Sequence, residues 1–190
     1  GGDAPVAVLK HIAEQSGFVN QQRESLSKQR FTRTLFDKRF SRLVVGNTDK
    51  SVMLMMLRNG LSLRISAAAL FNDGATEVIP GKEWLLDAIA DVIVSLNNEI
   101  RIVHVLPLQT PVPGGSQQTV WNLAMERSWN VREYFLKIGA MTEERCSLGV
   151  KILPPGGAQN ENDMPGDHLE VLFVGYHPSR ADLPESLLMN

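Results

Sequence analysis

The sequence contains one cysteine, Cys146, among its 190 residues. A single thiol cannot form an intrachain disulfide, and it cannot build a zinc site of several thiolates. No motif pairs Cys146 with a base, so we expect a small core residue here and not a nucleophile. Disulfide-stapled folds and thiolate zinc modules are therefore excluded.

Long apolar runs and a strong net charge are also absent. No stretch approaches the roughly 18 to 20 consecutive apolar residues of a membrane-spanning helix, and no signal-peptide pattern precedes the first expected helix. With 21% charged residues and a net charge of -2, the chain has no field that would recruit nucleic acid. Gly1-Gly2 resembles the remnant of a cleaved fusion, so we expect any membrane anchor upstream of residue 1. The hydrophobic content of 43% is enough for one core.

Signatures of catalysis are lacking too. There is no Gly-rich phosphate loop, no dinucleotide fingerprint and no Gly-x-Ser-x-Gly elbow. A zinc site needs three or four protein ligands, and the histidines are not spaced to share a helix face. They are His11, His104, His168 and His177. We therefore expect no enzyme activity, no metal and no cofactor.

What the chain does contain is alternating helical and strand patterns. Apolar residues at helical spacing predict helices over residues 4–45, 82–97 and 120–138. Apolar runs and alternation predict strands over 52–57, 61–66, 100–106 and 169–176, and 146–150 reads as an edge strand or turn. Right-handed crossovers place the two later helices on one face of the sheet. The fold class predicted is α+β, a two-layer sandwich with a mixed sheet preceded by an N-terminal helix.

Finer features follow from the same patterns. Asn59-Gly60 predicts a tight hairpin turn with positive φ angles. The inner stripe of the long helix is expected to comprise Ala124, Ser128, Val131, Phe135 and Ile138. Packing is the expected role of the tryptophans on the predicted helices, Trp84, Trp121 and Trp129, and the expectation is weakest for Trp121, which lies at a helix start beside a loop. The polar tail after Tyr176 is expected to fray.

The stretch from the third strand to the long helix carries a family resemblance. Residues 120–128 read Val-Trp-Asn-Leu-Ala-Met-Glu-Arg-Ser. They resemble the OmpA/MotB C-terminal family, in which a strand leads into a Gly-His-Thr-Asp loop and a helix bearing Asn-x-x-Leu-Ser-x-x-Arg-Ala. Leu70-Phe71 with Gly74 resembles the family's opening, and Leu169-Glu170-Val171 resembles its closing strand. The resemblance covers about residues 50–176, and the Trp-x-Leu arrangement is most similar to MotB, the flagellar stator protein.

The resemblance implies a domain organisation and a role. Residues 1–49 become an amphipathic helical linker segment, 50–178 the OmpA/MotB-like domain, and 179–190 a C-terminal tail. The implied function is a periplasmic anchor of a flagellar motor stator, held non-covalently to the peptidoglycan stem peptide. The implied assembly is a homodimer that joins a membrane-embedded stator partner through an inner-membrane span upstream of the sequence.

The ligand implied by the family is diaminopimelate, a zwitterion that needs an anion for its ammonium and donors for its carboxylate. Arg127 matches the family's arginine and is expected to grip the carboxylate, helped by the positive end of its helix. The residues expected to shape the surrounding site are Trp121, Asn122, Gln109, Thr110 and Leu108.

This signature is degenerate, however. No Asp or Glu occurs between Glu99 and Glu126 to supply the anion, Val120 stands at the helix-start Asn, and Gly166-Asp167-His168 stands at the family's Asn-Arg-Arg. The loss of one charge-assisted hydrogen bond costs roughly 1.5 to 3 kcal/mol, which predicts wall binding that is weakened or lost.

Two other roles remain open from the sequence. One is a protein-interaction module of the cell envelope, which would show an apolar patch around Leu106, Leu108 and Trp121 in place of a polar cleft. The other is the OmpA-like anchor of an outer-membrane lipoprotein or of a secretion system, which would require a lipidated cysteine upstream.

Overall fold

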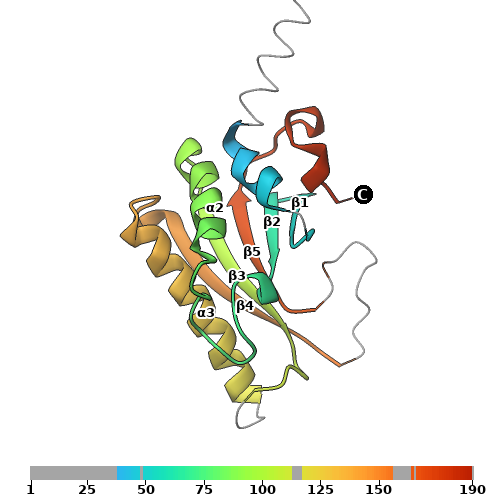
Figure 1. The fold of residues 1–190 in the computed structure, drawn as a ribbon, viewed down its shortest axis with the longest axis vertical. Coiled ribbons are helices and arrows are strands. Elements are labelled where there is room, and N and C mark those ends of the chain that lie inside the picture. The colour runs from blue at the N-terminus through green and yellow to red at the C-terminus, as the bar shows by residue number, and fades with distance from the viewer. Residues whose placement is uncertain (1–37, 48, 113–116, 156–163, 165, 190) are drawn as a thin grey trace, which may run out of the picture.

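A five-stranded sheet with two long helices over one face forms the body of the domain in the computed structural model (Figure 1). The structure describes residues 38–47, 49–112, 117–155, 164 and 166–189. The strands are β1 (Val52–Leu57), β2 (Gly60–Ser66), β3 (Ile100–Pro107), β4 (Cys146–Leu153) and β5 (His168–Val174). The helices are α2 (Glu83–Ser95) and α3 (Gln117–Lys137), and residues 38–46 are also helical. The predicted α+β two-layer architecture is confirmed.

The order of the strands in the sheet is β1-β2-β5-β3-β4. The last strand in the chain, β5, lies at the centre and runs antiparallel to both β2 and β3. β3 and β4 are parallel and are connected through α3, which makes the sheet mixed as expected. The register aligns Leu63, Val171 and Ile102 in one row across the three central strands, and all three are fully buried. This row belongs to the face that the helices cover.

The β1–β2 hairpin forms as predicted, but its turn is built differently. The turn residues are Arg58 and Asn59, and Gly60 is already the first residue of β2, paired with Leu57. Positive φ occurs at Gly60 (146°) and not at Asn59. A Cβ at Gly60 would lie 2.1 Å from the carbonyl oxygen of Phe173. Glycine is therefore required here because β5 approaches the backbone closely, as well as by the chain reversal.

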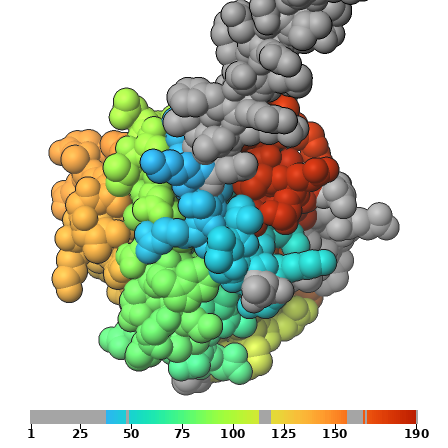
Figure 2. Space-filling model, turned by 45° about the horizontal axis from the view of Figure 1, so that its top comes forward, coloured from blue at the N-terminus to red at the C-terminus, as the bar shows by residue number. Residues whose placement is uncertain are grey.

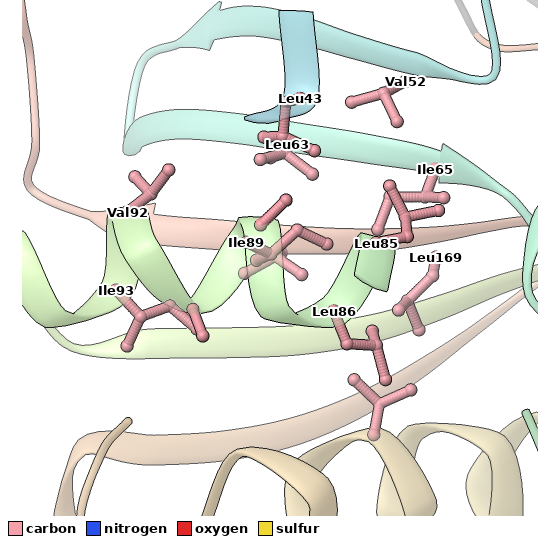
Figure 3. Packing of buried hydrophobic residues seen from close by; sticks show 14 of the residues in the cluster. Leu43, Val52, Leu63, Ile65, Leu85, Leu86, Ile89, Val92, Ile93 and Leu169 are labelled. Carbon is pink, nitrogen blue, oxygen red and sulfur yellow. The ribbon is translucent and has the colours of Figure 1, made fainter. Parts of the chain in front are cut away.

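Helix α2 supplies the apolar layer against the sheet. Its buried positions recur at three- and four-residue steps, as the periodicity predicts. Figure 3 shows Leu85 and Ile89 lying against Leu63, Ile65 and Leu169 of the sheet. Burying each such side chain stabilises the fold by about 1.5 to 3 kcal/mol. The core thus holds the sheet ends, and the loops that follow them, in fixed positions.

Helix α3 buries a narrower stripe than expected. Ala124, Ser128, Val131 and Phe135 are fully buried, whereas Ile138 is 44% exposed. The helix ends at Lys137, and Gly139 follows with a φ of 73°, so Ile138 leaves the stripe. α3 packs mainly over β3 and β4.

The tryptophans on the helices pack less completely than expected. Trp84, Trp121 and Trp129 are 37%, 42% and 50% exposed. Each directly neighbours a buried residue in sequence, namely Leu85, Val120 and Ser128. One residue along a helix rotates a side chain by about 100°, which carries it away from the core.

Both ends of the described chain pack beside β1 and α2. Phe40 and Leu43 of the helix over residues 38–46 are fully buried, and the rest of the predicted linker lies outside the described residues. Figure 2 shows this segment, in blue, between α2 in green and the C-terminal residues in red. No helix among the described residues is both long enough and apolar enough to cross a membrane.

The prediction of a frayed C-terminal tail is wrong over residues 179–189. Leu183 and Leu187 are buried in the core, and Leu188 forms a bridge to Leu54 of β1. Met189 also donates its backbone N–H to the carbonyl of Leu54, at 3.0 Å. The two leucines spaced four apart supply an apolar anchor that the polar composition of the tail obscures.

Candidate functional site

Arg127 lies inside the domain and not on its surface. It projects from α3, is 3% exposed, and faces the loop that follows β2 and its 3-10 turn η1 (Ala67–Ala69). Its Nε donates to the carbonyl of Ala75 at 2.6 Å, and its Nη2 donates to the carbonyl of Asn72 at 3.1 Å. Its guanidinium carbon lies 4.7 Å from the centre of the Phe71 ring. Arg127 therefore fixes the conformation of the loop 71–75.

Asp167 neutralises this buried guanidinium. One carboxylate oxygen accepts a hydrogen bond from Nη1 of Arg127 at 2.8 Å, and the other lies 2.5 Å from Nε2 of His104. Because a carboxylate only accepts, Nε2 of His104 carries the shared hydrogen. His104 is fully buried on β3, and its ring meets Phe71 edge-on at 6.1 Å. Asp167 thus ties β3, α3 and the loop 71–75 together.

These groups meet because the ends of β2 and β3 and the start of β5 lie at the same end of the sheet. Ser66 at the end of β2 pairs with His168 at the start of β5, and Val105 near the end of β3 pairs with the same residue. The loops that leave β2 and β3 and the loop that enters β5 therefore converge. The sequence carried Asp167 in the place of the family's Asn-Arg-Arg, but the sequence pattern alone does not show that it reaches Arg127.

A cavity of about 510 Å³ opens between two of these loops. Its lining consists of Asp73, Gly74, Leu108, Gln109, Thr110, Pro111 and Val112. The second loop is held by its own hydrogen bonds, since Thr110 Oγ1 donates to the carbonyl of Pro107 at 2.7 Å and Leu108 N donates to the carbonyl of Leu153 at 2.9 Å. Val112 packs against a small apolar cluster that includes Leu106 and Val120. The cavity is therefore bordered by a hydrogen-bonded loop, and Val112 connects its lining to the cluster at the start of α3.

Asp73 is the charged side chain that lines this cavity. It is exposed, and its carboxylate makes no hydrogen bond or ion pair with the rest of the described chain. The sequence has no acid between Glu99 and Glu126, but the structure brings Asp73 to the cavity from the loop after β2. The sequence feature that contains Asp73 is the Leu-Phe-x-x-Gly opening, in which Asp73 lies between Phe71 and Gly74.

The residues expected at the site divide into three groups. Leu108, Gln109 and Thr110 line the cavity. Arg127 lies behind the loop 71–75. Trp121 and Asn122 are exposed on the first turns of α3, outside the lining of the cavity but next to the cluster around Val120.

Several other ionisable groups in the described chain are buried or paired with neighbouring protein groups. His168 is buried beside Gly166, whose carbonyl lies 3.1 Å from Nδ1, and burial lowers the pKa of this imidazole. Burial raises the pKa of the Cys146 thiol. On the sheet face away from α2, Glu170 accepts hydrogen bonds from Ser62 at 2.8 Å and pairs with Arg64 at 3.3 Å. No group of three or more potential metal ligands occurs within the described ranges.

The architecture is similar to that of several solved structures. No protein-family model matches the sequence, and no curated protein matches it. Among solved structures, the chain is similar to the cell wall anchor of the T6SS from Pseudomonas aeruginosa, with 13% identity and a TM-score of 0.55 over 71% of this chain and 96% of that one. It is also similar to a putative MotB-like protein from Desulfovibrio vulgaris, with 19% identity and a TM-score of 0.53 over 78% and 97%. The periplasmic domain of Helicobacter pylori MotB gives 16% identity and a TM-score of 0.55 over 67% and 82%.

The fold is OmpA/MotB-like. In this OmpA/MotB-like domain the loop after β3, where the family resemblance has a Gly-His-Thr-Asp loop, contributes Leu108, Gln109 and Thr110 to the lining of the cavity.

Proposed function

We propose that this chain is a cell-wall-anchoring domain of the periplasm that binds the peptidoglycan stem peptide non-covalently. The observation that carries the proposal is the cavity between residues 73–74 and 108–112, because the loop after β3 is the ligand loop in the family that the sequence resembles. The similarity to a T6SS cell wall anchor and to MotB periplasmic domains supports the same role. The chain acts by holding on to the wall and not by catalysis.

Within this proposal the predicted site residues take distinct roles. Leu108, Gln109 and Thr110 contact the ligand from the loop after β3. Trp121 and Asn122 contact the wall polymer at the rim, next to the cavity wall formed by Val112. Arg127 serves the site by fixing the loop 71–75 through the carbonyls of that loop.

The finer assignment is a MotB-like stator subunit of the flagellar motor. In this assignment the domain is a homodimer, anchored to the inner membrane through a span upstream of Gly1 and coupled to a membrane-embedded stator partner. The support is the Trp-x-Leu arrangement in α3 and the similarity to MotB domains. The similarity to a T6SS wall anchor favours a second candidate, an anchor of a secretion system, with the same wall-binding cavity.

A pure protein-interaction module is less well supported by the geometry. Its expected sign was an apolar patch around Leu106, Leu108 and Trp121. Leu106 is fully buried, and Leu108 lines a cavity that also exposes an acid, an amide and a hydroxyl. The apolar patch expected for this role is therefore not continuous, because Leu106 is buried and polar side chains interrupt the lining around Leu108.

Sedimentation of the full chain with purified cell walls tests the proposal. We expect the wild type to pellet with the walls. Gln109→Trp places a bulky ring in the cavity and should leave the protein in the supernatant, because the ring occupies the space of the ligand. Lys137→Trp is the matched control, since it adds the same ring at an exposed position where α3 ends. Wild-type protein that stays in the supernatant refutes wall binding, and equal pelleting of both variants refutes the cavity as the site.

A further inference from the structure

The charges around the cavity are arranged asymmetrically. Asp73 contributes an exposed carboxylate without a partner in the described chain, and it is the charged member of the lining. Behind this loop lies the buried cation Arg127 of α3, which donates to the carbonyls of Asn72 and Ala75 on either side of Asp73 and Gly74. The cavity therefore presents a negative charge on a loop whose shape a buried cation maintains.

The charge of Arg127 is already balanced inside the domain. Its Nη1 bonds to Asp167, and the guanidinium is 3% exposed. A ligand carboxylate that approached Arg127 would have to enter the protein interior and lie beside the carboxylate of Asp167. Like charges at that distance repel each other, and desolvating a second anion carries its own cost. Arg127 is thus a positioning residue for the loop and is not available to a ligand anion.

From this arrangement we infer that the cavity selects an ammonium group and is indifferent to a carboxylate beside it. This inference rests on the proposed wall-binding function and names the part of the stem peptide that is recognised. Asp73 accepts from the ammonium, which has three donors and no acceptor. The Gln109 side chain, which lines the same cavity, offers a further acceptor. A diamino acid whose neighbouring carboxyl is amidated is therefore bound as readily as the zwitterion.

Chemically modified walls separate the two groups of the ligand. Walls are used untreated, N-acetylated to remove ammonium groups, or amidated at their carboxylates, each with the wild-type chain and with Asp73→Asn. We expect wild-type affinity to be unchanged by amidation and to fall about tenfold to a hundredfold on acetylation, the equivalent of one charge-assisted hydrogen bond. Asp73→Asn should show the same loss on untreated walls and no further loss on acetylated ones.

Glu77→Gln is the matched control, because Glu77 is an exposed acid that follows the same loop but does not line the cavity. It should bind all three wall preparations like the wild type. Amidation that weakens binding as much as acetylation overturns the inference, as does a loss in Glu77→Gln equal to that in Asp73→Asn. If the wild type binds none of the three wall preparations, the proposed function itself is refuted. If it binds untreated walls but binds them through the carboxylates of the wall, wall binding stands and only the ammonium inference is refuted.

Discussion

Replacing Asp167 by asparagine tests whether the buried charge of Arg127 depends on this one carboxylate. The substitution keeps the size of the side chain but leaves the guanidinium without a counter-charge. Removing one partner of a buried ion pair costs about 3 to 5 kcal/mol. Asp167 is 24% exposed, while Arg127 is 3% exposed, so partial hydration places the expected loss at the lower end, near 3 kcal/mol.

The free energy of unfolding is measured by equilibrium urea denaturation. A loss of that size corresponds to a fall in Tm of roughly 6 to 12 °C for a domain of this length. The control is Asp91→Asn, which breaks the ion pair of Asp91 with Arg42, whose side chains are 41% and 49% exposed. Exposed pairs contribute roughly 0.2 to 1 kcal/mol. If Asp167→Asn costs no more than this control, Arg127 does not depend on Asp167, and the assignment of Arg127 as an internally neutralised residue is refuted.

Two further predictions concern the tail and the response to pH. Leu187→Ala should destabilise the domain by about 2 to 5 kcal/mol because it opens a cavity in the core, whereas Ser186→Ala, at an exposed neighbour, should be near neutral in the same urea titration. Because burial holds the pKa of His168 below its ordinary value of 6.5, the folded chain binds fewer protons than the unfolded chain, so its contribution to stability is complete above pH 6.5 and declines as the pH falls. His168→Gln should reduce this decline between pH 7 and pH 5, and an unchanged pH dependence would show that other groups cause it.

Much of the fold follows from local patterns in the sequence. The alternation of Leu61, Leu63 and Ile65 and the helical spacing of Leu85 and Ile89 report directly which face is buried. The closing strand β5 was also found this way, although its central position depends on long-range pairing. Residues 146–150, which the sequence left open as an edge strand or a turn, belong to the edge strand β4. The tail was misjudged because two leucines, Leu183 and Leu187, outweigh a polar composition when they reach the core.

The site was harder to predict because its charges come from segments far apart in the chain. Arg127 was found through its place in α3, but its partner Asp167 lies 40 residues away along the chain. A search for an acid near the loop after β3 could not find Asp73, which reaches the cavity from the loop after β2. Spacing in the sequence predicts which residues share one element, whereas convergence of loops depends on the order of strands in the sheet.

The positions of the cavity and of residue 38 determine how the domain would respond to mechanical tension. Lys38 lies near Val94 and Ile138, where α2 and α3 end, whereas the cavity opens where β3 ends and α3 begins. A pull between a ligand in the cavity and the chain at residue 38 would therefore run along the strands. Such a load stretches the hydrogen bonds between neighbouring strands in shear, so that they resist together, and does not peel them apart one after another.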